Sequence, residues 1–471
     1  MTKHAAVLPG YSHYHATRMD QSHALHLHEI LGALSHAIDM TEGQPRGHAM
    51  RCCWIGMQIG TQMGLPDDQL ADLYYTVLMK DLGCSSNAAR ICALFLTDDI
   101  AFKKDHKKAD AHNINDVLRF VVTKIGTEAG LAERIRAMVG LLRNKGEISR
   151  EMFQTRCHQG ANIAAKLRFP QAVQDGIRNL DERWDGKGEP EGRRGTEIPL
   201  ISQIALLAQV IDVFYQSDGP AAATKEAIAR KGSWFNPAIV TAFAACTAHR
   251  DFWTALHPDE TEARVYAIAP RQTAYSIDDD YLDDIAEGFA DVIDAKSPFT
   301  ADHSRRVTLY ADMIAEEVGL GQGHRRWLRR AALLHDIGKL AVSNRILDKP
   351  GRPSSQEWES IRAHPAHSQA VLSRVSAFCD IAPVAGAHHE RLDGNGYPDG
   401  QTEETLPYEA MILATADVYD ALSADRPYRA AMSHEQAMAI LENDCGTAHH
   451  PVFVAALATG LSRLSTTAMS A

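Results

Sequence analysis

The stretch that decides the fold is His335-Asp336-Ile337-Gly338-Lys339, taken with the run His-His-Glu-Arg-Leu-Asp-Gly-Asn-Gly-Tyr-Pro over residues 388–398. Each run places histidine and a carboxylate, the side chains that hold catalytic metal ions, beside glycines that allow the chain to turn sharply. One such cluster arises easily by chance. Two in one chain predict a metal centre assembled from separate segments.

Helical periodicity predicts how these segments meet. His303 shares one helical face with the apolar residues Val307 and Tyr310, at intervals of four and seven residues. His335 ends a second apolar helix, and Asp417 lies on the alanine-rich face of a third. A carboxylate on a buried face is costly unless it is paired or metal-bound. The pattern predicts an all-α chain, with ligands converging from several helices.

The candidate metal ligands are imidazoles and carboxylates, with no thiolate among them: His303, His335, Asp336, His364, His388, His389 and Asp417. This donor set favours two divalent ions, with iron or manganese ahead of zinc or nickel. Asp336 is the expected bridge. Two such ions can hold a hydroxide between them for in-line phosphoryl transfer. Lys339, one helical turn beyond Asp336, is the expected catalytic cation.

Residues further along are candidates for substrate binding. Gly394 and Gly396 allow close approach of the backbone, and Tyr397 can offer its ring or hydroxyl. Arg426 and Arg429 can contact phosphate or stack on a base. The alternative is structural, with a turn that only packs Tyr397 and two ordinary surface arginines.

The chain repeats itself at long range. The 32-residue interval of 303–335 recurs over 48–80, and the 24-residue interval of 393–417 recurs over 185–209. Such correspondence predicts a duplicated domain, and so two tandem helical bundles, rather than a short-period repeat.

The first copy keeps His48 and Asp81 but has lost the other ligands. The replacements are Lys80 for His335, Arg156 for His364, Leu180 and Asp181 for His388 and His389, Gln209 for Asp417, Cys84 for Lys339, and Glu189 for Tyr397. Two ligands cannot hold a dinuclear centre, so we expect no catalytic metal in this half. Its role is open between a structural or dimerisation domain and a regulatory module.

These features predict the domain boundaries. Residues 1–26 form a poorly ordered leader, and 27–250 form the degenerate copy, with an insertion at about 85–131. The insertion is either a solvated helical elaboration or a partner surface. Residues 251–283 form a linker, and 284–462 the catalytic domain.

Composition sets further limits. The 471 residues carry a net charge of −12, which argues against nucleic-acid and membrane-surface partners. No apolar stretch reaches the roughly 18 residues that a membrane span needs. The eight cysteines include no C-x-x-C pair, which favours reduced thiols and a cytoplasmic location.

Over residues 285–460 the sequence resembles the HD-GYP family of bacterial cyclic di-GMP phosphodiesterases. The matching motifs are His335–Lys339, His388–Pro398 and the run from Ala416 to Arg429. The resemblance implies that the seven candidates are the metal ligands. It also implies that Lys339, Tyr397, Arg426 and Arg429 contact the dinucleotide. The implied reaction converts cyclic di-GMP to pGpG, with GMP as a further product.

One departure bears on the metal count. Family members with a third metal carry glutamate four residues before the first histidine, where this chain has Phe299. We therefore expect two ions. Other readings stay open: hydrolysis of another cyclic dinucleotide or nucleotide, or a signalling scaffold with little turnover. A homodimer or a regulatory protein partner is also compatible with the sequence.

Overall fold

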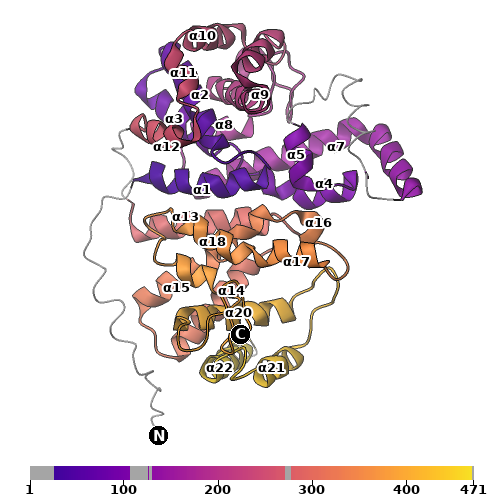
Figure 1. The fold of residues 1–471 in the computed structure, drawn as a ribbon, viewed down its shortest axis with the longest axis vertical. Helices are drawn as coiled ribbons and strands as arrows, with labels where there is room; N and C mark the ends of the chain where they lie inside the picture. Colours follow the sequence, from indigo (N-terminus) through magenta and orange to yellow (C-terminus); the bar gives the residue numbers. More distant parts are fainter. Residues whose placement is uncertain (1–25, 107–125, 127–129, 271–276, 469–471) are drawn as a thin grey trace.

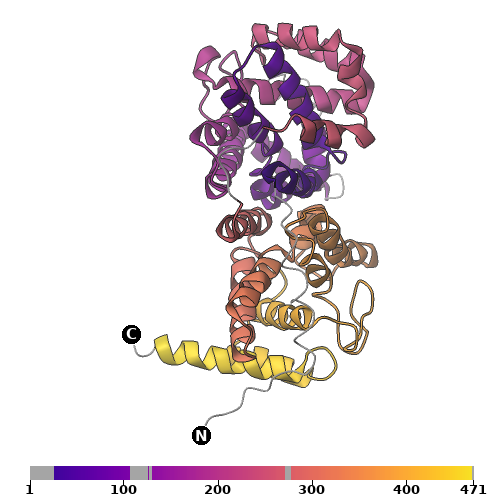
Figure 2. The same cartoon turned by 90° about the vertical axis from the view of Figure 1, so that its left-hand side faces the viewer.

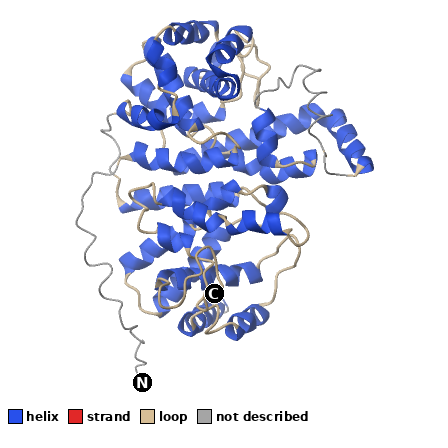
Figure 3. Cartoon of the chain, in the orientation of Figure 1, coloured by secondary structure: helices blue, strands red, loops and turns tan. Residues whose placement is uncertain are grey.

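The structure is a computed structural model, and it describes residues 26–106, 126, 130–270 and 277–468. Throughout these residues the regular secondary structure is helical, with only isolated β-bridges in loops (Figure 3). The prediction of an all-α fold is confirmed. Residues 1–25, most of the expected leader, and 107–125 and 127–129 of the expected insertion lie outside the described residues.

The chain forms two stacked groups of helices, which we call the N-terminal and C-terminal halves (Figures 1 and 2). The N-terminal half contains α1 (Leu27–Thr41), α2 (His48–Gln62), α3 (Asp67–Leu78), η1 (Cys84–Asn87), α4 (Ala88–Phe95), α5 (Asp99–His106), α7 (Leu131–Lys166), α8 (Gln171–Arg178), η2 (Gly195–Glu197), α9 (Leu200–Ala229), α10 (Pro237–Thr247), α11 (Arg250–Thr254) and α12 (Pro258–Ala267).

The C-terminal half contains α13 (Asp279–Asp294), α14 (His303–Glu317), α15 (Gln322–Leu334), η3 (Ile337–Ala341), α16 (Asn344–Leu347), α17 (Ser355–Arg362), α18 (His364–Leu372), α19 (Ala382–Gly386), α20 (Tyr408–Ser423), α21 (His434–Asn443) and α22 (Pro451–Ala468). Helices α14, α15 and α20 pack together, and their apolar faces form the core behind the candidate ligands.

Equivalent turns in the two halves have the same construction. The buried carboxylate of Glu390 accepts hydrogen bonds from main-chain amides of 399–401, and that of Glu182 accepts them from 191 and 192. Gly338 lies so close to α18 that a Cβ there would meet a carbonyl at 2.0 Å, and Gly83 meets α7 in the same way at 1.9 Å. The geometry therefore repeats where the sequence repeats.

Helix α9 is the core helix of the N-terminal half. Among the described residues it alone is long and apolar enough to cross a membrane, but 72% of its apolar window is buried inside the protein. The helix also breaks at Gly219, which has a φ of 82° and is followed by Pro220. The apolar face of α9 packs on α2, α3 and α8, as expected of a buried bundle helix.

The segment expected to link the domains is partly helical. Phe252, Leu256 and Val265 of this segment are buried. The indole of Trp54 in α2 donates a hydrogen bond to the carbonyl of Phe252 at 3.2 Å. Residues 250–267 thus complete the N-terminal half, and 271–276 lie outside the described residues.

The two halves contact each other at η3 and α18, which carry Lys339 and His364, and also at α13 and α16. Helix α1 packs against η3 and α18, and α4 of the expected insertion packs against α16 (Figure 1). The described part of the insertion therefore meets the C-terminal half of the same chain.

Candidate metal centre

The predicted ligands lie at five positions along the C-terminal half and come together in space. His303 begins α14, and His364 begins α18. His335 and Asp336 lie between α15 and η3, while Asp417 lies inside α20. The adjacent histidines 388 and 389 follow the short helix α19. All but His389 are almost completely buried, and for His303, His335 and Asp417 the apolar periodicity predicted this burial.

The carboxylate of Asp336 lies between two groups of histidines. Its Oδ2 is 3.3 Å from His303 Nε2 and 3.4 Å from His335 Nε2. Its Oδ1 is 3.2 Å from His364 Nε2 and 3.7 Å from His388 Nε2. Because one oxygen faces each group, Asp336 is placed to bridge two ions.

Asp417 and His389 complete the two groups. Asp417 Oδ1 is 3.3 Å from His303 Nε2, and its Oδ2 is 3.8 Å from His389 Nδ1. Within each group the ligand atoms all lie within 4.8 Å of one another: His303, His335 and Asp417 in the first, and His364, His388 and His389 in the second. All seven predicted ligands are thus in one cluster.

The outer nitrogens of the histidines are held so that the inner ones face the cluster. Nδ1 of His335, His364 and His388 each donates to the main-chain carbonyl three residues earlier, at 2.6–2.7 Å. Nδ1 of His303 lies 2.7 Å from Asp420, a carboxylate also bound by the Arg306 guanidinium. Such partners fix the ring orientation and tautomer of metal-binding histidines.

Three inner atoms of the cluster have no hydrogen-bond partner. The buried Nε2 atoms of His303 and His335 and the Oδ1 atom of Asp336 accept or donate no hydrogen bond. Buried polar atoms without a partner are costly, and bound cations would satisfy these three together. The residues therefore fit a metal centre, and their nitrogen and oxygen atoms suit first-row divalent ions.

Burial and mutual repulsion favour the neutral form of three of these imidazoles. Burial lowers the pKa of His364, moves that of His388 well below its usual value, and lowers that of His389 to about 3. His303 differs from these three. Burial opposes its protonation, but the carboxylates of Asp336, Asp417 and Asp420 beside it raise its pKa to about 10.

The two aspartates in the cluster are held in the ionised form. Burial favours protonation of both, but neighbouring histidines outweigh it and move the pKa of Asp336 and Asp417 well below the usual value. Metal ions bind carboxylates and neutral imidazoles. Most of the cluster is therefore in the protonation state that binds metal.

One edge of the cluster is open to solvent. The side chain of Lys339 is 18% exposed and its Nζ lies 2.5 Å from Asp336 Oδ2. The side chain of His389 is 21% exposed, against 7% or less for the other six candidate ligands. A phosphate reaching the cluster from solvent would enter between Lys339 and His389.

Comparison with known proteins agrees with this geometry. A family model described as "HD domain" matches residues 136–236 and 287–450, and so falls in both halves. The 3'3'-cGAMP-specific phosphodiesterase 3 of Vibrio cholerae is 47% identical over 438 residues, which cover 93% of this chain and 95% of that protein. The chain belongs to the HD-GYP family.

One further relative matches over a shorter length, and one solved structure matches over both halves. The cyclic di-GMP phosphodiesterase response regulator RpfG of Xanthomonas campestris is 38% identical over 177 residues, covering 37% of this chain and 47% of that protein. A crystal structure of a cyclic GMP-AMP specific phosphodiesterase of V. cholerae has a TM-score of 0.64 and 43% identity, covering 93% of this chain and 97% of that one. The prediction of a phosphodiesterase of the HD-GYP family is confirmed.

The Gly-Tyr-Pro turn of this HD-GYP protein lies beside the open edge. The ring of Tyr397 is 4.8 Å from the ring of His389. Gly394 has a φ of 73°, and a Cβ on Gly396 would lie 2.4 Å from main-chain atoms of Glu390 and Arg391. Both glycines are therefore required by the turn itself. Contact of any of the three with substrate stays a prediction.

The two predicted arginines lie at the C-terminal end of α20. Arg429 donates to the carbonyls of Ala421, Leu422 and Ala430, at 2.7–2.9 Å. Arg426 Nε donates to the carbonyl of Ala421 at 3.4 Å. Cations suit the last turn of a helix, so these contacts give both arginines a structural role. Their contact with a dinucleotide stays a prediction.

Sequence reasoning missed Asp420 and Arg306, the pair that holds His303. The available signal was the second aspartate in Ala416–Asp420, three residues after Asp417 and therefore one turn along the same helix.

The N-terminal half keeps this supporting pair. His48 Nδ1 lies 2.6 Å from Asp212, and Arg51 Nε donates to the same carboxylate at 2.6 Å. Ion pairs occupy the positions of the lost ligands: Lys80 contacts Asp81, and Arg156 lies 2.6 Å from Asp181.

Among the described residues of this half, two groups of possible ligands remain: His48 with Cys52 and Asp212, and Glu42 with Asp81 and Cys84. Asp212 is bound by Arg51, and Asp81 by Lys80. These cations support the prediction that the N-terminal half holds no catalytic metal.

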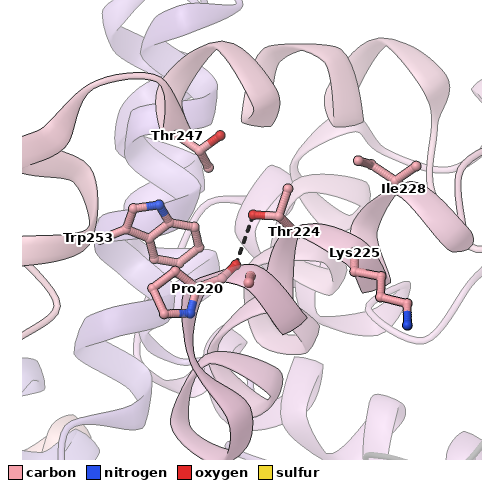
Figure 4. Close-up of a pocket in the computed structure, with 7 residues that line it drawn as sticks. Pro220, Thr224, Lys225, Ile228, Thr247 and Trp253 are labelled. Carbon is pink, nitrogen blue, oxygen red and sulfur yellow. Dashed lines mark hydrogen bonds between the residues drawn. The ribbon is translucent and has the colours of Figure 1, made fainter.

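A surface pocket also lies in the N-terminal half, next to the break in α9 (Figure 4). Its lining residues are Pro220, Ala221, Thr224, Lys225, Ile228, Thr247 and Trp253. Lys225 is the charged member of this lining, and no metal-type ligand belongs to it. The pocket therefore contributes nothing to the metal centre.

Proposed function

We propose that this protein is a metal-dependent phosphodiesterase that opens a cyclic dinucleotide to a linear dinucleotide. The observation that carries the proposal is the complete cluster of seven ligands with Lys339 at its open edge. A protein that only binds dinucleotide needs neither the full set nor the lysine. The N-terminal half, with two ligands left, shows how such a site decays.

Two divalent ions fit the two groups that share Asp336, and we propose iron or manganese. Bound there, they would supply an activated water and positive charge for the phosphate. Lys339 then stabilises the negative charge that develops on the phosphate oxygens. Tyr397, whose ring lies 4.8 Å from that of His389, is placed beside the path by which a substrate would reach the cluster.

The relatives differ in substrate. The protein that is 47% identical over both halves is named for 3'3'-cGAMP, whereas RpfG, which is named for cyclic di-GMP, matches 37% of this chain. We propose 3'3'-cGAMP as the preferred substrate because that likeness extends over the whole chain. Cyclic di-GMP, the substrate expected from sequence and converted to pGpG, is the second candidate.

For the N-terminal half we propose a supporting role. It packs directly against η3 and α18, which carry Lys339 and His364. A regulatory ligand or protein partner would act on the site through the same contacts. Homodimer formation is compatible with this arrangement and is tested by measuring the molar mass in solution.

The deciding experiment is an anaerobic assay of purified protein loaded with Fe(II) or Mn(II). Cyclic di-GMP and 3'3'-cGAMP are supplied separately, and products are resolved by chromatography. We expect a linear dinucleotide from both, with a higher kcat/KM for 3'3'-cGAMP and no product from a His335→Ala, Asp336→Ala variant. Metal-loaded protein that binds either dinucleotide without product would instead support the scaffold reading.

A further inference from the structure

An exposed tryptophan lies beside the open edge of the metal centre. Trp358 in α17 is 45% exposed, which is unusual for the largest apolar side chain. Its ring centroid lies 6.1 Å from that of Tyr397, which in turn lies 4.8 Å from His389. The rings of His389, Tyr397 and Trp358 therefore form a row from a candidate ligand to the exposed surface.

The tryptophan is held rigidly with respect to the centre. Helix α17 begins with a capping box in which Ser354 and Glu357 exchange side-chain and main-chain hydrogen bonds. The helix ends at Arg362, and a single residue separates it from His364, which begins α18. The guanidinium of Arg362 lies over the Tyr397 ring, 5.0 Å from its centroid. Trp358 therefore cannot move far from the cluster without moving a candidate ligand.

The N-terminal half shows what these positions become when the ligands are lost. The interval that relates His364 to Arg156 also relates Trp358 to Arg150 and Tyr397 to Glu189. Arg150 and Glu189 form an ion pair at 3.6 Å. The fold thus accepts a charged pair here. The aromatic pair accompanies the complete ligand set and is not a requirement of the fold.

We propose that Trp358 stacks on a purine base of the substrate while the adjoining phosphate lies at Lys339. This inference rests on the proposed function and names a substrate-binding residue within it. Every base has a π-face, and an exposed indole offers it a flat surface. Since stacking discriminates weakly between bases, Trp358 supplies affinity for both candidate dinucleotides rather than preference for one.

The test compares Trp358→Ala and Trp358→Phe with wild type on three substrates: 3'3'-cGAMP, cyclic di-GMP and bis(p-nitrophenyl) phosphate, a diester without a base. We expect Trp358→Ala to raise KM for both dinucleotides about 5- to 100-fold, the range for loss of one stacked base, with kcat nearly unchanged. Trp358→Phe should restore most of the affinity. Hydrolysis of the base-free diester should stay at the wild-type rate.

A binding measurement provides a second readout. In a Lys339→Ala background, where turnover is slow, either dinucleotide should quench tryptophan fluorescence. Adding Trp358→Phe should abolish most of this quenching. Adding Trp253→Phe, at the pocket in the N-terminal half, should leave it intact.

Two results would overturn the inference. If KM for both dinucleotides is unchanged in Trp358→Ala, the tryptophan does not contact substrate. If Trp358→Ala loses hydrolysis of the base-free diester to the same extent as hydrolysis of the dinucleotides, Trp358 only supports the fold. Failure of the proposed function looks different, because wild-type protein would then hydrolyse neither dinucleotide, whether or not it binds them.

Discussion

The buried carboxylate of Asp99 accepts a hydrogen bond from the hydroxyl of Ser343 at 2.9 Å, across 244 residues of sequence and between the two halves. The same oxygen accepts a hydrogen bond from the main-chain amide of Asn344 at 2.8 Å. Lys296, also buried, lies 3.7 Å from Asp99 and donates to the carbonyl of Leu340 at 3.3 Å. Leu340 follows Lys339 in η3, so the insertion is joined to the catalytic segment.

Replacing Asp99 with alanine should destabilise the protein by about 2–4 kcal/mol. The change leaves the buried Lys296 ammonium without its nearest carboxylate and the start of α16 without an acceptor. Denaturant unfolding followed by circular dichroism measures the loss. Asp98→Ala is the matched control. Asp98 accepts one amide at the exposed start of α5, so about 1 kcal/mol is expected. Equal losses in the two variants would contradict an inter-half role for Asp99.

Lys296 should make stability depend on pH in the alkaline range. Burial lowers its pKa from 10.5 to about 8, although Asp99 opposes this. Between these values the unfolded chain holds the proton and the folded protein does not, so the free energy of unfolding should rise with pH. The slope is at most about 1.4 kcal/mol per pH unit. Subtracting the pH profile of Lys296→Met isolates this term, and parallel profiles from pH 8 to 10 would refute it.

Lys339→Ala should lower kcat by about 10²–10³, because the ammonium stabilises charge that grows in the transition state. Metal content should be unchanged, since the lysine is not among the seven ligands. Steady-state kinetics and elemental analysis of the same preparation separate the two effects. Lys349→Ala, which removes an ion pair with Glu357 at the protein surface, is the control. Wild-type turnover without Lys339 would remove its assigned role.

Elemental analysis should find two divalent ions per chain. Both ions should be lost when the ligands in the C-terminal half are replaced. We expect His303→Ala to lose metal and His48→Ala, the equivalent change in the N-terminal half, to keep both ions. The reason is that Lys80 and Arg156 already neutralise the carboxylates there. Three ions in active protein, or loss of an ion in His48→Ala, would contradict this assignment.

Removing residues 1–270, which include the helices over 250–267 that complete the N-terminal half, should weaken the metal site even though it leaves every candidate ligand in place. The deletion exposes the sides of η3 and α18 that α1 covers. We expect a C-terminal fragment with a lower melting temperature and lower metal affinity, which calorimetry and metal titration would measure. A fragment with unchanged stability, metal affinity and kinetics would show that the N-terminal half is dispensable to the site.

The sequence predicted the helical fold and the cluster of ligands because both depend on short-range patterns. His303 and Asp417 stand on apolar faces, and a helix carries such faces into the core. The contact of Asp99 with Ser343 has no such signature, since a single aspartate in a charged segment has no periodic partner. The guanidinium of Arg429 was likewise interpreted as a ligand for phosphate, and only the structure shows that it binds helix carbonyls.

The expected linker illustrates another limit. A proline in such a segment is compatible with an irregular chain, but Pro258 stands at the start of α12. Proline is favoured in the first helical turn, where its missing N–H leaves no hydrogen bond unmade. Distinguishing these two uses requires knowing what the following residues pack against, and that is a property of the folded protein.

The ion pairs Lys80–Asp81 and Arg156–Asp181 have a consequence for the life of the protein in a cell. In the N-terminal half these ion pairs neutralise the buried carboxylates without any bound ion. The C-terminal half instead depends on metal taken from its surroundings. When metal is scarce, we expect the N-terminal half to stay folded and to keep α1 packed against the ligand-bearing helices. Starvation would then silence the enzyme without committing it to degradation, and activity should return with the metal, before any new protein is made.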